Sequence, residues 1–154
     1  MFGRSHTHHL YREQLVPRPL DDVFAFFAEA RNLERITPAW LGFSLASPEP
    51  EGMGTGTLIE YRLHVHRIPL RWISRIELWE PGRAFVDVQV KGPYRLWHHR
   101  HEFQPAGSGT LVRDHVTYAL PLGPLGDLAH SLFVERDLAR IFAFRHEAVA
   151  SLLG

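Results

Sequence analysis

The sequence contains no cysteine, and this absence excludes several kinds of site at once. Without thiols there can be no disulfide scaffold, iron–sulfur cluster, thiolate zinc site or cysteine nucleophile. Long apolar runs are also missing, so no segment is expected to insert stably into a membrane. Neither sign of charge dominates, because 17 Lys and Arg side chains balance 17 Asp and Glu side chains, and this balance argues against nucleic acid as a partner. Residues 1–10 lack the apolar stretch of a secretory signal, so a cytoplasmic location is expected.

The composition that remains is that of a globular protein. The chain has 154 residues, of which 45% are hydrophobic and 22% charged. A chain of this length forms one domain with a real core, or with a shell of core around a cavity. We therefore expect residues 1–154 to form a single domain with a flexible segment at 1–7. The composition leaves monomer and homodimer open.

Hydrophobic periodicity predicts the order of the secondary-structure elements. One strand comes first, followed by two short helices, with Asn32 as the N-cap of the second. A series of period-two strands follows, and the chain ends in one long amphipathic helix. The expected ranges are 7–16 for the first strand, 19–30 and 33–37 for the short helices, 57–68, 70–79, 84–90, 94–104 and 111–120 for the later strands, and 125–153 for the last helix. This order predicts an α+β fold in which a curved antiparallel sheet of six or seven strands wraps around the C-terminal helix.

Alternation also assigns most strand residues to a face of the sheet. In 70–79, the pattern places Leu78 on the same buried face as Ile76. In 84–90, it leaves open whether Asp87 or the valines on either side of it point inward.

Several polar side chains fall on faces that are otherwise apolar. Asp114 shares its face with valines, and His99 and His101 lie between two aromatic residues on the strand before it. Arg145 lies on the apolar stripe of the last helix. A buried carboxylate needs a partner or takes up a proton, and a buried arginine either reaches the rim or pairs with an acid. These residues form either the polar end of a cavity or a closed structural network in which nothing binds.

Four local strings carry a resemblance to a known superfamily. They are Pro17–Phe24 (PRPLDDVF), Asn32–Pro38 (NLERITP) with Trp40–Phe43 (WLGF), Gly92–His99 (GPYRLWHH) and Ile141–Arg145 (IFAFR). From about His8 onward the chain resembles the START-like helix-grip superfamily, also called SRPBCC, which includes polyketide cyclases and coenzyme Q-binding proteins. It looks closest to bacterial ligand-binding members, some of which resemble a domain fused to sugar-nucleotide epimerases. The resemblance implies the helix-grip form of the α+β fold and an elongated apolar cavity between the sheet and the long helix.

From the residues and the resemblance together, we expect the protein to bind or transport a mostly apolar small molecule, such as a lipid, a quinone or a polyketide-like compound. The expected lining of the cavity is Ile59, Tyr61, Leu63, Trp72, Trp97, His99, His101, Asp114, Tyr118, Leu138, Ile141, Phe142 and Arg145.

Two other functions stay open. The first is a cyclase or dehydratase without a metal or nucleotide cofactor, in which His99 or His101 works with Asp114 as a general acid–base pair and Tyr118 stabilises an enolate. The second is an interaction module that binds a partner enzyme through the exposed face of the sheet and has no ligand.

A metal cofactor is not expected. The pattern His-x-His places two imidazoles on one face of a strand, and it occurs as the pairs His6/His8, His64/His66 and His99/His101. The first pair lies near the terminus and the second on a solvated face, so only the third could reach a further ligand, namely Asp114. The chain also has no cysteine ligand and no His-Glu-x-x-His helix, so we expect neither a metal nor another cofactor.

Overall fold

The computed structural model describes residues 6–154. Most of the segment expected to be flexible, residues 1–5 of 1–7, therefore lies outside the described residues. The elements are β1 (His8–Val16), α1 (Leu20–Ala28), α2 (Asn32–Arg35), η1 (Ala39–Leu41), β2 (Ser44–Leu45), β3 (Leu58–Val65), β4 (Ile68–Glu80), β5 (Ala84–Lys91), β6 (Leu96–Ala106), β7 (Gly109–Ala119), α3 (Pro124–Ala129), η2 (His130–Val134) and α4 (Glu135–Leu153). Within this part of the chain, no helix combines the length and the apolarity needed to cross a bilayer.

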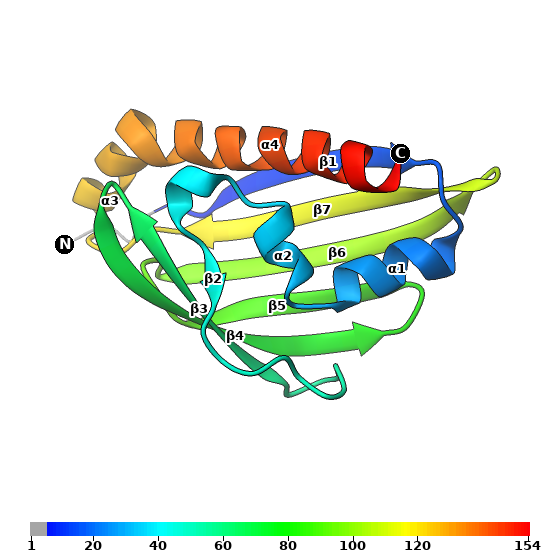
Figure 1. The fold of residues 1–154 in the computed structure, drawn as a ribbon. Helices are drawn as coiled ribbons and strands as arrows, with labels where there is room; N and C mark the ends of the chain where they lie inside the picture. Colours follow the sequence, from blue (N-terminus) through cyan, green and yellow to red (C-terminus); the bar gives the residue numbers. More distant parts are fainter. Residues whose placement is uncertain (1–5) are drawn as a thin grey trace.

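The seven strands form one antiparallel sheet in the order β1-β7-β6-β5-β4-β3-β2. The sheet curves, α4 runs along its concave face, and α1 and α2 lie across the same side of the sheet beside α4 (Figure 1). The predicted helix-grip α+β fold is therefore confirmed. The physical reason is that both the helix and the sheet carry an apolar face, and packing one against the other buries both.

The C-terminal helix is interrupted near its start, which the sequence pattern did not predict. Instead of one α-helix over 125–153, α3 is joined to α4 by the π-helical turn η2. A π turn carries a wider repeat than the α-helix and so resets which residues face the sheet. Here it buries His130, whose Nε2 lies 2.7 Å from the Tyr118 hydroxyl.

A β-bulge in β4 overturns the predicted placement of Leu78. Ile76 pairs with Asp87, but the next pair is Leu78 with Val86, so an extra residue has been inserted into β4. An inserted residue shifts the later side chains to the opposite face. Trp79 rather than Leu78 therefore packs inward, where its ring lies 5.3 Å from that of Phe24.

Two further expectations about element ends were wrong. Asn32 does not cap α2: it lies inside the helix, and its side-chain amide donates instead to the Phe26 carbonyl at 2.8 Å. The strand predicted over 57–68 ends at Val65, because His66 turns the chain with a φ of 49°. His66 is consequently not simply solvated, since its Nε2 lies 2.9 Å from Asp137 Oδ2 on α4.

The core is divided, and this division leaves room for a cavity. One cluster forms where Phe24 and Phe26 of α1 pack against Phe85 and Phe103 of the sheet. A second cluster, which includes Leu138 and Phe142, lies under α4. A third lies beneath the short helices, around Ile59, Tyr61 and Ile76. Residues of the second and third clusters, such as Leu138 and Tyr61, line a common cavity that these side chains do not fill.

Candidate functional site

A cavity of about 250 Å³ opens between the sheet, α4 and the segment that contains α2 and η1. Its wall is mostly aromatic and aliphatic. The lining residues are Leu33, Ile36, Thr37, Leu41, Phe43, Tyr61, Leu63, Val65, Trp72, Ser74, Asp87, Pro93, Tyr94, Trp97, His99, His101, Leu120, Val134, Leu138, Ile141, Phe142 and Arg145.

Most of the residues predicted to line a cavity do lie on this wall. They are Tyr61, Leu63, Trp72, Trp97, His99, His101, Leu138, Ile141, Phe142 and Arg145. They come from the alternating inward positions of β3, β4 and β6 and from the apolar stripe of α4, which is why periodicity could identify them.

The structure places three predicted lining residues elsewhere. Ile59 lines a neighbouring pocket of about 70 Å³. Asp114 lies behind the two histidines and lines a small crevice on the far side, together with His146. The Tyr118 hydroxyl is turned toward His130 Nε2 rather than toward the cavity, because η2 brings that imidazole against it.

Several wall residues were missed, and Asp87 is the one that matters most. It is the direct cross-strand partner of His99, so it points into the cavity with the two histidines. Its strand showed no clear inward face, and only the pairing with β6 could have assigned one. Leu41 and Phe43 both line the cavity, whereas Trp40 is exposed.

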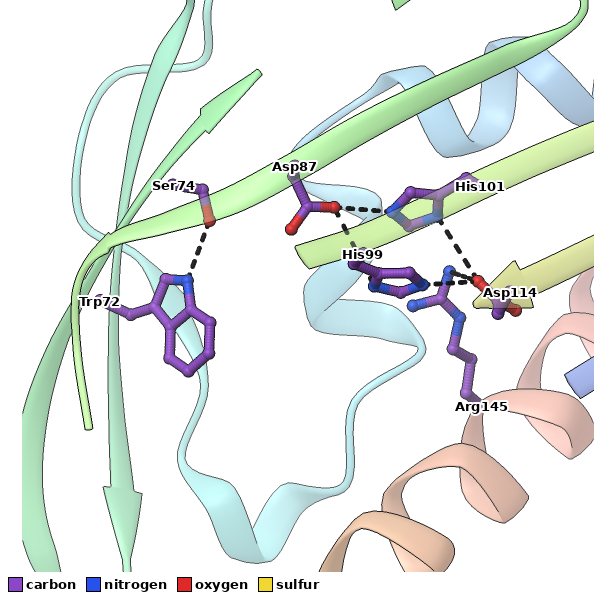
Figure 2. A network of polar contacts seen from close by, with 7 residues as sticks. All are labelled: Trp72, Ser74, Asp87, His99, His101, Asp114 and Arg145. Carbon is purple, nitrogen blue, oxygen red and sulfur yellow. Dashed lines mark hydrogen bonds and ion pairs between the residues drawn. The ribbon is translucent and has the colours of Figure 1, made fainter. Parts of the chain in front are cut away.

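The aromatic wall is built from rings that meet edge to face. Trp72 and Trp97 lie 5.3 Å apart at an interplanar angle of 90°, and Tyr94 packs 4.9 Å from Trp97. This arrangement is the favoured one for aromatic pairs and holds the rings in place. The Trp72 indole N–H is satisfied by the Ser74 hydroxyl at 2.9 Å, so the wall offers a flat apolar surface there (Figure 2).

At one end of the cavity, two carboxylates, two imidazoles and one guanidinium form a continuous buried network (Figure 2). His101 Nε2 lies 2.6 Å from Asp87 Oδ2, and His99 Nε2 lies 2.8 Å from Asp114 Oδ1. Arg145, which reaches in from α4, donates to the same Asp114 oxygen at 3.3 Å. The two imidazole rings stack with their centroids 3.7 Å apart.

The charges in this network follow from burial and from the partners. Burial alone would raise the pKa of Asp114, but the Arg145 charge and the His99 hydrogen bond outweigh it and hold that pKa well below its usual range. Burial likewise opposes ionisation of Asp87, and the hydrogen bond and charge of His101 overcome it and lower the pKa. Burial, reinforced by His99, lowers the pKa of His101 to about 4. At neutral pH the network therefore carries two carboxylates and one guanidinium, with His101 neutral.

One nitrogen in this network makes no hydrogen bond. His101 Nδ1 is buried and is without a hydrogen-bond partner among the described residues, although Asp114 Oδ1 lies 3.5 Å from it. When neutral His101 donates its one ring proton from Nε2 to Asp87, its Nδ1 turns a lone pair toward the Asp114 carboxylate. Two electron-rich atoms then face each other in a buried site, and such an arrangement is costly.

Comparison with known proteins gives a family and a set of structural neighbours. A family model described as polyketide cyclase / dehydrase and lipid transport matches residues 16–144. Comparison with proteins of curated function gave no match.

Three solved structures illustrate the likeness. The Zhui aromatase/cyclase from Streptomyces sp. R1128 is 18% identical, with a TM-score of 0.74 over 96% of this chain and 94% of that one. Protein TTHA0849 from Thermus thermophilus is 17% identical, with a TM-score of 0.71 over 96% of this chain and all (100%) of that one. The nucleoside-diphosphate sugar epimerase from Corynebacterium glutamicum is 21% identical, with a TM-score of 0.66 over 92% of this chain but only 28% of the epimerase. At these identities the likeness shows a shared fold.

Proposed function

The chain belongs to the polyketide cyclase / dehydrase and lipid transport family, and from that premise we propose that it binds an uncharged, ring-bearing small molecule in the cavity under α4. The observation that carries the proposal is the cavity itself, whose aromatic walls end in a buried polar network. An interaction module without a ligand would fill this interior with its own side chains, so the open cavity favours ligand binding.

The size of the cavity limits the ligand. An apolar cavity of about 150 Å³ holds benzene, so 250 Å³ accommodates roughly ten non-hydrogen atoms. One or two fused rings fit this space, whereas a long acyl chain or a full quinone tail exceeds it. Trp72, Tyr94 and Trp97 supply the flat surfaces against which such rings pack.

The charge of the polar end limits the head group. Asp87 presents its carboxylate on the cavity wall, whereas the Arg145 guanidinium is paired with Asp114, so the charge that a ligand meets at this end is that of Asp87. A carboxylate or phosphate on the ligand would be repelled there, and its desolvation would cost free energy as well. A phenol or ketone meets neither penalty and can hydrogen-bond to the histidines.

Two probes of similar size test this proposal by isothermal titration calorimetry. In the presence of a chelator, which keeps the protein free of metal, we expect 1-naphthol to bind with a stoichiometry of one and 1-naphthoate to bind at least about tenfold more weakly, a difference of about 1.4 kcal/mol. Filling the cavity with Ile141→Trp should abolish naphthol binding, whereas the control Leu152→Trp, on the exposed side of α4, should leave it unchanged. Equal binding of both probes, or binding that survives in Ile141→Trp, would contradict the proposal.

The natural ligand is identified by native mass spectrometry of the protein purified from its own host, followed by organic extraction. A stoichiometric adduct with one or two rings and no acidic group agrees with the proposal. An adduct that carries a long acyl chain or an acidic group overturns it.

A second candidate function, cyclisation or dehydration of the bound molecule, is favoured by one contact. The Asp87 carboxylate lies on the cavity wall, where a contact of 2.6 Å with His101 Nε2 orients it, and it can take a proton from a carbon next to a ketone. Aldol cyclisation with dehydration releases one water. Extracts of the wild-type protein and of Asp87→Asn should then contain species that differ by one water, and identical extracts would exclude this reaction.

A further inference from the structure

We propose that Asp87, His99 and His101 bind one divalent transition-metal ion of the Zn²⁺ or Fe²⁺ class, with its open coordination positions facing the cavity. The proposal goes beyond the binding of an apolar molecule and does not depend on it. It starts from the placement of three ligand types that such ions prefer on one face of two adjacent strands.

The three side chains bring their donor atoms close together. A carboxylate oxygen of Asp87 and one ring nitrogen of each histidine all lie within 4.8 Å of one another. Asp87 Oδ2 lies 2.6 Å from His101 Nε2 and 4.0 Å from His99 Nδ1. A tetrahedral ion with bonds of about 2.0 Å needs donors about 3.3 Å apart. The distance from Asp87 Oδ2 to His101 Nε2 then has to lengthen by about 0.7 Å, and the distance to His99 Nδ1 has to shorten by about 0.7 Å.

Asp114 supplies the support that metal-binding histidines ordinarily have. A ligating imidazole almost always donates its other ring N–H to a carboxylate or a carbonyl. His99 turns Nε2 toward Asp114 Oδ1 at 2.8 Å, and His101 turns Nδ1 toward the same oxygen at 3.5 Å. Each imidazole therefore points one nitrogen at Asp87 and the other at Asp114, whose position is fixed by Arg145.

A metal ion also removes the one unfavourable contact in the network. When His101 Nε2 ligates a metal instead of donating to Asp87, its single ring proton moves to Nδ1 and points at Asp114. The buried nitrogen that otherwise lacks a partner becomes a hydrogen-bond donor to a carboxylate. The set of side chains is thus better satisfied with an ion between Asp87 and the histidines than without one.

The sequence offered Asp114 as the third ligand beside His99 and His101, and no metal was expected because the chain has neither a cysteine nor a His-Glu-x-x-His helix. The structure instead supplies Asp87 as the ligand and places Asp114 on the far side of the imidazoles. Three protein ligands leave at least one coordination position free, and in this site that position opens into the cavity. An oxygen on a bound molecule would complete the coordination.

The test is metal binding by protein stripped with a chelator, without any organic ligand. Titration with Zn²⁺ should give one ion per chain, and Asp87→Asn should abolish it. Asp114→Asn should weaken binding by about 10–100-fold, because it removes support rather than a ligand. Zn²⁺ binding that is unchanged in Asp87→Asn, or no binding to the wild type, would overturn the proposal.

Surface histidines could hold an adventitious ion, so a matched control is needed. His9 and His115 form an exposed pair with nitrogens 3.1 Å apart. The double variant His9→Ala/His115→Ala should keep the full stoichiometry, and loss of the ion in this variant would refute the cavity site.

A measurement on the wild-type protein avoids the risk that a variant fails to fold. With Co²⁺ in place of Zn²⁺, proton NMR should show two exchangeable, strongly shifted imidazole signals, one from each ring N–H that faces Asp114. Shifts confined to other histidines would exclude the site. Because 1-naphthol titration is a separate measurement, ligand binding and metal binding can fail independently.

Discussion

Replacing Arg145 by methionine tests whether the buried ion pair shapes the polar end of the cavity. Arg145 and Asp114 are each 8% exposed, and the guanidinium is the only arginine or lysine group that contacts this carboxylate among the described residues. Methionine keeps most of the apolar stem but removes the guanidinium, whose Cζ lies 5.4 Å from the centre of the Phe27 ring and 5.6 Å from that of Phe142. The variant therefore leaves a carboxylate buried without its cation.

The expected loss is about 3–5 kcal/mol of unfolding free energy, the usual consequence of breaking one side of a buried ion pair. With a urea slope of about 2 kcal/mol per molar, the unfolding midpoint should fall by about 1.5–2.5 M. Urea titrations followed by circular dichroism, in the presence of a chelator, measure this shift. The control Arg140→Met, exposed on the same helix, should change the free energy by less than about 0.5 kcal/mol.

The double variant Arg145→Met/Asp114→Asn decides whether the pair is the cause. Asparagine removes the uncompensated charge, so the double variant should recover a large part of the stability that Arg145→Met loses. If the two losses simply add, or if Arg145→Met costs less than about 1 kcal/mol, the explanation by the buried pair is refuted.

Two further predictions concern the walls of the cavity and the start of the C-terminal helix. Burial raises the pKa of both Tyr61 and Tyr94 above the ordinary value of 10.0, so these phenols stay protonated in the folded state while the unfolded chain ionises. The free energy of unfolding should consequently fall as the pH rises above 10.0. In alkaline unfolding titrations, Tyr61→Phe or Tyr94→Phe should make this fall less steep. An unchanged dependence of the unfolding free energy on pH would contradict the burial of the phenols. Gly126→Ala should destabilise by about 1–3 kcal/mol, although alanine is the better helix former, because its Cβ would overlap the Pro121 carbonyl oxygen. Thermal unfolding should show this loss, while the control Gly52→Ala, which has open space around it, should not.

The sequence was sufficient to predict the fold because the fold depends on strong periodic signals. The inward positions of β6 and β7 alternate without interruption, so Trp97, His99, His101 and Asp114 could be assigned to one face in advance. The places where prediction failed are irregular ones. The bulge after Ile76 inserts a residue into β4, and the π turn at η2 widens the helical repeat. No periodic pattern in the sequence signals either of them.

The site required a further piece of information, the register between strands. Asp87 lies opposite His99, and His101 lies opposite Asp114. Each carboxylate makes its short contact with the other imidazole, diagonally across the two neighbouring strands. A one-residue slip of β5 against β6 would turn Asp87 to the outer face of the sheet. The two imidazoles would then have Asp114 as their only carboxylate partner, and neither the Asp87–His101 contact nor the metal site could form.

Register also explains why forming this polar network costs little side-chain entropy. The acid–imidazole pairs are diagonal neighbours on adjacent strands, about 7–8 Å apart, and an imidazole and a short carboxylate together span this distance without long flexible stems. Asp87, His99, His101 and Asp114 lose little side-chain entropy on pairing, because few rotatable bonds are fixed. Arg145 is the exception, since it reaches in from α4 and ties the helix to the sheet through Asp114. The sheet therefore holds the four short side chains in place, and Arg145 of α4 completes the network. A movement of α4 away from the sheet would break the contact between Arg145 and Asp114, and Asp114 would then position both histidines less firmly.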